Sequence, residues 1–512
     1  MFLGNFADRG SAANYGLAKP KANQLFLQVA GGKFELFPCP AVEVPMRCSG
    51  AVFADLDNDG DLDLYVTSNR QAKPFGEDWQ RVVRGAGCRL YRNDGCGRFV
   101  DVSETSGACP ADFFRCRDIG VFDVDGDGLL DLFVMQDKGI GPDDVVTGLK
   151  LFRNRGRFQF EDVVGQVGLP TDLWGAGIAV ADLNGDRRPD FYVCGGNRLF
   201  LSQAVGRPSQ ADTASGNKSR HGKADLRVTY HEPEAQRATF NQPEGELDWV
   251  TGAAFGDLDR DGDLDLITGR HHYHGQSRVH VYLNDGLRDG EPRFREITRE
   301  LGLPPLPQKA PHPEIQDFDN DGLLDLYWSV DVVDGTTRRP FICRGLGVSD
   351  GLPRFAVPSV PEFSDEVLKQ NVPPPDRAAM IYHVNGPALD YDGDGDLDIL
   401  GGNWPPGGSH VLRNDTPAGH WLQVRVVGRC MNRQGIGAQV RAFTIPREGV
   451  PRRLLGFQEI TLNGGYSSSR PAQVHFGLGE ITECELEVTF PTCAEPCLRR
   501  LRTNQTICIT EP

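Results

Sequence analysis

The sequence predicts an all-β fold: a seven-bladed β-propeller whose first blade is incomplete, followed by a small β-sandwich. Three observations predict it. An Asp-rich nine-residue pattern recurs six times between residues 55 and 398, short apolar segments flank the copies, and the 61 Gly and 35 Pro residues accompany no long helical tract. Repeated short strands with tight turns are typical of a propeller. We expect residues 1–418 to form the propeller and residues 419–512 the sandwich.

The repeat has the form D-x-[DN]-x-D-x-x-x-D, with Gly at position 6 in five of the six copies. Successive copies start 68, 59, 75, 60 and 73 residues apart. A repeat of this length indicates one supersecondary unit used many times. We number the copies as loops 1 to 6: Asp55–Asp63, Asp123–Asp131, Asp182–Asp190, Asp257–Asp265, Asp317–Asp325 and Asp390–Asp398.

Each unit is predicted to hold four strands. In the first unit, the apolar run Ala51–Ala54 precedes the loop and Leu64–Val66 follows it. A third segment ends in Asn, as in Leu90–Asn93, and a fourth is built around Phe, as in Arg98–Val102. Four strands of this kind make one propeller blade.

The N-terminal residues resemble part of a further unit. Residues 1–6 are similar to the strand that follows a loop, and residues 24–27 and 33–37 are similar to the third and fourth strands. A seventh Asp loop would belong before residue 1, so we expect the chain to lack its true start and the blades to number seven. Residues 204–246 are expected to be a flexible surface insertion, and strand-like alternation without Asp loops begins near His420.

The loops have the composition of calcium sites. Carboxylates at positions 1, 3 and 5 supply hard oxygen ligands, the backbone carbonyl of position 7 can add another, and the Asp at position 9 completes the shell. The predicted ligand residues are Asp55, Asp57, Asp59, Asp61, Asp63, Asp123, Asp125, Asp127, Leu129, Asp131, Asp182, Asn184, Asp186, Arg188, Asp190, Asp257, Asp259, Asp261, Asp263, Asp265, Asp317, Asp319, Asp321, Leu323, Asp325, Asp390, Asp392, Asp394, Asp396 and Asp398.

Five or six bound Ca²⁺ ions are expected. Loop 3 is the weakest candidate or an empty one, since it has Arg187 in place of Gly and Asn184 at position 3. An EF-hand would require Glu at position 12, where loops 1 and 2 have Val66 and Val134 inside β-patterned sequence. Magnesium is disfavoured because it takes fewer protein ligands. A role in turn formation alone is disfavoured because six copies keep the same register.

Net charge, hydropathy and cysteine content restrict the classes of partner and compartment that the sequence favours. The net charge of -17 disfavours nucleic acid and anionic membrane surfaces, and no apolar run is long enough for a membrane-spanning helix. The 13 cysteines suggest disulfides in an oxidising compartment, with burial as small apolar side chains as the alternative. Their connectivity cannot be deduced from the sequence.

The loops resemble the FG-GAP or VCBS repeats of integrin α-subunit propellers. The segments Gly435–Val440, Asn463–Ser468, Val474–Gly479 and Leu486–Pro491 resemble the ASPIC/UnbV domain. Together they are similar to the cartilage acidic protein family and its bacterial relatives. This resemblance implies an extracellular propeller with calcium in the blade loops and a fused β-sandwich. The sequence contains no calcium-binding EGF-like module of the kind found in animal members, so roles specific to those members are not transferred.

These observations favour an extracellular or secreted adhesion or interaction module that binds a protein or glycan, with structural calcium and no catalytic activity. The alternative is a propeller enzyme of the lyase, hydrolase or quinone-dependent dehydrogenase type. His271, His272 and His274 are its best local candidates, although a solvated turn explains them as well. Glycosylation sequons occur at Asn217, Asn414 and Asn504, near the number expected by chance.

Overall fold

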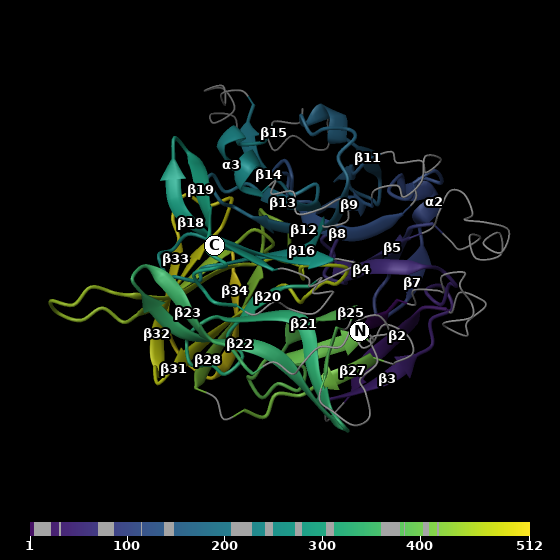
Figure 1. Ribbon diagram of the computed structural model, residues 1–512. Helices are drawn as coiled ribbons and strands as arrows, with labels where there is room; N and C mark the ends of the chain where they lie inside the picture. Colours follow the sequence, from purple (N-terminus) through teal and green to yellow (C-terminus); the bar gives the residue numbers. More distant parts are fainter. Residues whose placement is uncertain are drawn as a thin grey trace.

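The structure is a computed structural model (Figure 1) that describes residues 1–4, 22–29, 32–69, 87–113, 115–137, 148–205, 228–240, 249–271, 279–303, 312–359, 379–382, 384–402, 409–416 and 419–512. Within these ranges the chain is almost entirely β, with nine small sheets. Its helical elements are short: α2 (Ser103–Ser106), the 3-10 turn η2 (Val164–Gln166) and α3 (Glu234–Phe240). No described helix has the length and apolar character needed to cross a membrane.

The sheets that carry the Asp loops are antiparallel and use neighbouring strands in chain order. The first three are β4 (Cys48–Ala54), β5 (Asp63–Ser68), β6 (Arg89–Asn93) and β7 (Phe99–Asp101); then β8 (Cys116–Phe122), β9 (Asp131–Gln136), β10 (Lys150–Asn154) and β11 (Phe160–Asp162); then β12 (Gly175–Ala181), β13 (Asp190–Gly195), β14 (Arg198–Ala204) and β15 (Val228–His231).

The next three sheets repeat the order. They are β16 (Trp249–Gly256), β17 (Asp265–His271), β18 (His280–Arg288) and β19 (Glu291–Glu296); then β20 (Glu314–Gln316), β21 (Asp325–Asp334), β22 (Thr337–Ser349) and β23 (Leu352–Ala356), with β24 (Ala379–Tyr382) added to β21; then β25 (Val384–Leu389), β26 (Asp398–Gly402) and β27 (Ser409–Leu412). In all six sheets an Asp loop joins the first strand to the second.

The first strands of successive sheets contact one another in the order β4, β8, β12, β16, β20 and β25. Small residues make this approach possible. A Cβ on Gly177 in β12 would lie 2.3 Å from the carbonyl oxygen of Thr251 in β16, so only glycine fits at that position. All seven residues of β12 are buried, as expected for a strand covered on both faces.

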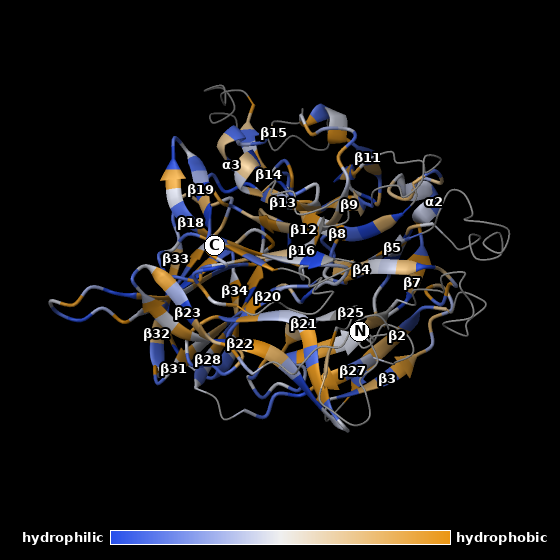
Figure 2. Cartoon of the chain, viewed as in Figure 1, coloured by the Kyte–Doolittle hydropathy of each residue, from blue (hydrophilic) through white to orange (hydrophobic). Residues whose placement is uncertain are grey.

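Larger side chains fill the space between adjacent sheets. Phe122, Phe133 and Phe191 pack together, with ring centroids 4.9 to 6.2 Å apart. The strands carry many apolar residues (Figure 2), and those buried between neighbouring sheets form apolar clusters. Burial of these aromatic side chains is a large part of what stabilises each pair of sheets.

Residues 1–37 supply a sheet of their own, as the sequence predicted. It contains β1 (Phe2–Leu3), β2 (Gln24–Val29) and β3 (Lys33–Phe37). Leu25 belongs to a buried cluster with Leu64 and Val66 of β5. On its other side, the ring of Phe34 stacks on Tyr391 in loop 6, with centroids 6.1 Å apart. The sheet therefore contacts both the first and the last of the loop-bearing sheets (Figure 1).

The C-terminal residues form two further sheets. One has β28 (His420–Val427) between β31 (Gln473–Gly479) and β34 (Gln505–Thr510), with β34 parallel to β28. The other has the order β30 (Leu454–Glu459), β29 (Gln439–Thr444), β32 (Glu483–Thr489) and β33 (Cys497–Arg502). Both sheets contribute to one buried cluster that also includes residues of the first two loop-bearing sheets.

Two expectations are wrong. Residues 228–240, placed in a flexible insertion, form β15 and α3, because β15 pairs with β14 and its Val228 and Tyr230 are buried in the apolar cluster that contains Phe191; residues 206–227 and 241–248 lie outside the described ranges. All 13 cysteines are free thiols rather than disulfides. Cys88 and Cys96 show why proximity in sequence misleads: the Cys88 thiol is buried and the Cys96 thiol is exposed.

Candidate metal sites in the aspartate loops

All six loops have the same backbone conformation. Positions 4 and 6 are left-handed in every loop, with φ between 54° and 100°. Glycine adopts this conformation without steric cost, which explains the glycine at position 6. The requirement at position 4 was not recognised from the sequence. Its signal is nonetheless present, since five of the six loops have Asn or Gly there, and only loop 4 has another residue, Arg260.

The aspartate at position 9 ties its loop to the third strand. In loop 4, Leu258 N donates to Asp265 Oδ2 at 2.7 Å, and Asn284 N donates to Asp265 Oδ1 at 2.8 Å. The corresponding pair of hydrogen bonds is present in every other loop. The Asn that ends the third strand, Asn284 here, also donates to the Leu264 carbonyl at 3.4 Å. Position 9 therefore has a structural role beside any role as a ligand.

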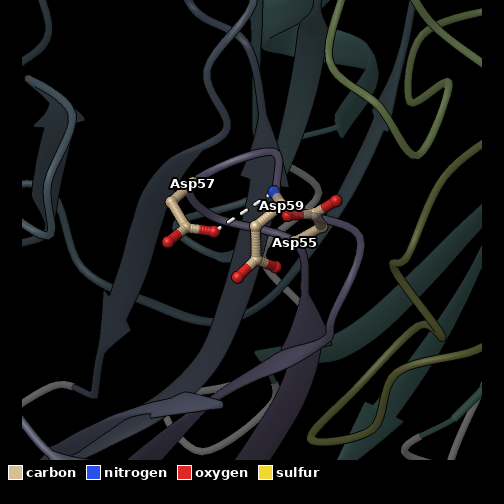
Figure 3. A group of neighbouring side chains, drawn as sticks. All are labelled: Asp55, Asp57 and Asp59. Atoms are coloured by element: carbon tan, nitrogen blue, oxygen red, sulfur yellow. Dashed lines mark hydrogen bonds between the residues drawn. The ribbon is translucent and has the colours of Figure 1, made fainter. Parts of the chain in front are cut away.

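Five of the loops bring three carboxylates together, with one oxygen from each within 4.8 Å of the others. Figure 3 shows the group in loop 1, where the Asp59 amide also donates to Asp57 Oδ1 at 3.3 Å. The groups are Asp55, Asp57 and Asp59; Asp123, Asp125 and Asp127; Asp257, Asp259 and Asp265; Asp317, Asp319 and Asp325; and Asp390, Asp392 and Asp398. At position 7, the residue donates its N–H to the position 5 carboxylate, as Leu129 does to Asp127 at 2.9 Å; its carbonyl remains a predicted ligand.

Buried carboxylate oxygens without a hydrogen-bond partner occur in each of these five loops. They are Asp55 Oδ1, Asp125 Oδ1, both oxygens of Asp257, Asp259 Oδ1, Asp319 Oδ1 and Asp392 Oδ1. A buried anionic oxygen with no donor is costly. A hard divalent cation bound by oxygen ligands satisfies such atoms, so the residues present fit calcium in all five loops.

Electrostatics support the same conclusion. Burial, reinforced by Asp261 and Asp259, raises the pKa of Asp257 to about 7. Burial, reinforced by Asp325 and Asp321, raises the pKa of Asp317 to about 8. In both loops the clustered carboxylates resist ionisation at neutral pH unless a cation is present.

Loop 3 differs from the others. Its carboxylates do not form a convergent group of three, and neither oxygen of Asp182 lacks a donor: Oδ1 accepts from Gly185 N at 2.8 Å, and Oδ2 accepts from Arg187 N at 2.8 Å and Gln439 Nε2 at 3.2 Å. Arg188 forms an ion pair with Asp186 at 3.3 Å. Among the described residues, loop 3 also has no buried carboxylate oxygen without a hydrogen-bond partner, whereas each of the other five loops has at least one.

Comparisons with known proteins agree with the repeat and with the C-terminal strands. The FG-GAP-like repeat family matches residues 123–193 and 257–328, and the ASPIC and UnbV family matches residues 428–512. The chain contains FG-GAP-like repeats and an ASPIC and UnbV region.

Cartilage acidic protein 1 of three vertebrates is similar to most of the chain. The protein of Xenopus tropicalis is 25% identical over 465 residues, that of Mus musculus 23% over 464 residues, and that of Homo sapiens 22% over 460 residues. Each alignment covers 86% of this chain and 60 to 61% of the relative. A solved structure, the pilus 2b backbone protein of group B streptococcus, aligns with a TM-score of 0.13 at 8% identity over 51% of this chain and 96% of that chain, and carries no argument.

The ASPIC and UnbV region covers the ends of the FG-GAP-like loops. His475 Nε2 lies 2.7 Å from Asn320 Oδ1 in loop 5, and Gly479 N donates to the Asn320 carbonyl at 2.9 Å. In loop 1, Asp55 N donates to Gln434 Oε1 at 2.7 Å. Residues outside that matched region take part as well: Gln423 Nε2 donates to Asp390 Oδ2 of loop 6 at 2.9 Å. The candidate metal sites therefore lie at the junction with the C-terminal sheets.

Residues 463–468 reach further and contact the first strands. Asn463 Nδ2 donates to the Ile119 carbonyl in β8 at 3.2 Å, and Ala253 N in β16 donates to the Gly465 carbonyl at 3.2 Å. A Cβ on Gly177 in β12 would lie 3.0 Å from the same carbonyl oxygen, and one on Gly50 in β4 would lie 3.5 Å from Ser467 Cα. One short segment of the C-terminal region thus contacts four first strands.

Most of the remaining site candidates fall outside the described residues. His272 and His274 lie outside the described residues, as does Asn217, and the side chain of His271 is likewise not described. Asn414, in the second sequon, donates through Nδ2 to the Phe318 carbonyl at 2.6 Å and serves as the third-strand Asn of the last unit. Its structural role was not recognised from the sequence, although the repeated Asn was visible.

Proposed function

We propose that the chain is an extracellular or secreted interaction module in which calcium is structural. The first seven sheets, residues 1–416, form a seven-bladed propeller, and the ions join its loops to the C-terminal sheets. The observation that carries the proposal is the set of buried, unpartnered carboxylate oxygens in five convergent groups. The chemistry of these oxygens matches Ca²⁺, which takes six to eight oxygen ligands.

Calcium content tests this proposal directly. Full-length protein at equilibrium with millimolar calcium should hold up to five ions in excess of the dialysis buffer by elemental analysis, one for each loop except loop 3. Native mass spectrometry at defined free calcium gives an independent count. Two or fewer bound ions at millimolar calcium would contradict the proposal.

Contacts of residues 1–37 support closure of the ring. Gln28 Nε2 donates to the Tyr391 carbonyl of loop 6, and a Cβ on Gly32 would lie 3.0 Å from the Tyr391 ring. Cysteines introduced by Gln28→Cys and Tyr391→Cys should therefore form a disulfide on mild oxidation, read as a mobility shift without reductant. A closed ring of six blades, with residues 1–37 away from loop 6, would give no crosslink.

The partner is proposed to be an extracellular protein or glycan that binds away from the loops, because the C-terminal sheets cover the loop ends. Burial of the carboxylates also argues against their use in acid–base chemistry on a large substrate, so no catalytic activity is part of the proposal. The protein should capture its partner from extracellular material only when it is folded. Calcium should therefore be needed for capture only because it stabilises the fold. If the chain unfolded by complete removal of calcium still bound the partner, this dependence on the fold would be contradicted.

A further inference from the structure

One position in or beside the third strand differs among the six loop-bearing sheets in a way that the calcium proposal does not explain: the residue just before the one whose N–H donates to the position 9 aspartate. It is arginine next to loops 1, 2, 5 and 6, namely Arg92, Arg153, Arg344 and Arg413. It is leucine next to loops 3 and 4, namely Leu201 and Leu283. The backbone N–H of the following residue always donates to the position 9 aspartate, so these six positions are equivalent.

Three of these arginines form an ion pair with the position 3 aspartate. Arg153 contacts Asp125 Oδ2 and lies 3.5 Å from Asp127 Oδ2. Arg344 lies 3.0 Å from Asp319 Oδ2, and Arg413 lies 3.3 Å from Asp392 Oδ2. In each case the arginine contacts one carboxylate oxygen, while Oδ1 of the same aspartate is buried and unpartnered.

Arg153 has the strongest effect because it is buried. Its side chain is 2% exposed and that of Asp125 is 4% exposed, whereas the side chains of Arg344 and Arg413 are 51% and 54% exposed. Solvent screens an exposed charge much more than a buried one. Arg92 differs again, since its guanidinium lies 2.6 Å from Asp94, outside the loop.

Loop 4 has no such cation. Among the residues that the structure describes, no lysine or arginine forms an ion pair with any of its five aspartates. Its own Arg260 lies against Gly322 of loop 5, 3.6 Å from the position of a Cβ there. Both oxygens of the buried Asp257 are unpartnered, as is Asp259 Oδ1. Cations act on the aspartates of loop 4 from other elements instead, since Arg441 interacts electrostatically with Asp263 and Arg295 with Asp259.

We propose that a third-strand arginine paired with the position 3 aspartate lowers the calcium affinity of its loop, so that loop 2, which contacts the buried Arg153, fills last. The inference rests on the proposed calcium function and adds an order of filling to it. A unit positive charge about 6 Å from a divalent ion, even at the dielectric constant of water, opposes binding about tenfold. The arginines thus limit the affinity of their loops, with Arg153 the most effective.

A calcium titration of the full chain tests the order. Native mass spectrometry at stepped free calcium should show one ion bound well after the others. The substitution Asp123→Asn should abolish this last step, whereas Asp257→Asn should abolish an earlier step and leave the last one unchanged. Persistence of the last step in the Asp123→Asn protein would overturn the assignment.

The substitution Arg153→Leu tests whether the charge of this arginine lowers the calcium affinity of loop 2. Leucine occupies the same position next to loops 3 and 4, so the fold accommodates it. We expect the weakest step to tighten about tenfold. Lys150→Leu is the matched control. Lys150 lies on the same strand and pairs with Asp162 at 2.8 Å. Its substitution removes one positive charge at a position away from the loop, so the affinity of every calcium-binding step should stay the same.

The half-exposed Arg344 provides a second variant in case Arg153→Leu does not fold. Arg344→Leu should tighten one step by a smaller factor than tenfold, since solvent screens that charge. Unchanged or weakened steps in both arginine variants would overturn the inference. A wild-type chain that binds no calcium would instead overturn the proposed function, so the two failures are distinguishable.

Discussion

Gly477 in β31 offers a direct test of the contact between the C-terminal sheets and loop 5. A methyl group introduced by Gly477→Ala would lie 1.9 Å from Asp317 Oδ2, 2.5 Å from Asp317 Cγ and 2.6 Å from Asn320 Cα. Asp317 cannot turn away freely, because it is 3% exposed and its Oδ2 accepts a hydrogen bond from Gly322 N at 2.7 Å. We therefore expect β31 to move away from loop 5.

The magnitude follows from what that movement disrupts. Overpacking of a buried site costs about 1 to 3 kcal/mol. The displacement also weakens the contacts of Asn320 with His475 and Gly479, at 2.7 and 2.9 Å, and each lost hydrogen bond adds about 1 kcal/mol. The free energy of unfolding should fall by about 2 to 5 kcal/mol, which lowers the melting temperature of a chain of this size by about 2 to 5 °C.

Differential scanning calorimetry in calcium and in EDTA is the assay, with native mass spectrometry to count ions. Gly477→Ala should lower the melting temperature and remove one calcium-binding step. Gly165→Ala is the control: its new methyl group would meet only Thr171 Cγ2, at 3.8 Å, and should change the melting temperature by no more than about 1 °C. Equal melting temperatures and ion counts for Gly477→Ala and wild type would refute the contact.

Three further outcomes are expected. Chelation of calcium should lower the melting temperature by many degrees, because each filled site of about 0.1 to 1 mM affinity adds roughly 1 to 2 kcal/mol in a few millimolar calcium; an unchanged EDTA melt would exclude structural calcium. Burial lowers the pKa of His475 to about 4, so below about pH 6.5 the unfolded chain binds a proton that the folded chain does not. The free energy of unfolding should therefore fall by up to about 3 kcal/mol as the pH approaches 4. The substitution His475→Gln should reduce this pH dependence of the melting temperature. Thiol titration in denaturant without reductant should give 13 reactive cysteines, with Cys96, Cys430 and Cys508 reacting first in the folded protein; a count lower by pairs would show disulfides.

Local features were predictable from the sequence. The aspartates of each loop lie within nine consecutive residues, so the spacing predicts that carboxylates converge there, and three do in five of the six loops. Loop 3, where Arg187 and Asn184 depart from the pattern, has no such group of three among the described residues. The strands before and after each loop were recognisable because short apolar runs flank a fixed turn pattern.

Long-range features were not predictable. No local pattern marks Gly477 as different from the other glycines nearby, yet glycine is required there by the carboxylate of Asp317, 160 residues earlier in the chain. The ion pair between a third-strand arginine and its loop could not be predicted, because the two residues lie far apart in the sequence. Asp125, for example, precedes Arg153 by 28 residues. Such contacts depend on how separate elements pack together, and a single sequence does not specify that packing.

The contact of residues 463–468 with four first strands has a consequence for biosynthesis. These strands, β4, β8, β12 and β16, are complete by residue 256, about 200 residues before the segment that packs between them is translated. A nascent chain therefore exposes their inner surfaces throughout most of its elongation, when it is most prone to wrong association. Final consolidation of the molecule is consequently a post-translational event, and premature termination ahead of residue 463 would produce a chain that chaperones and proteases recognise as unfinished.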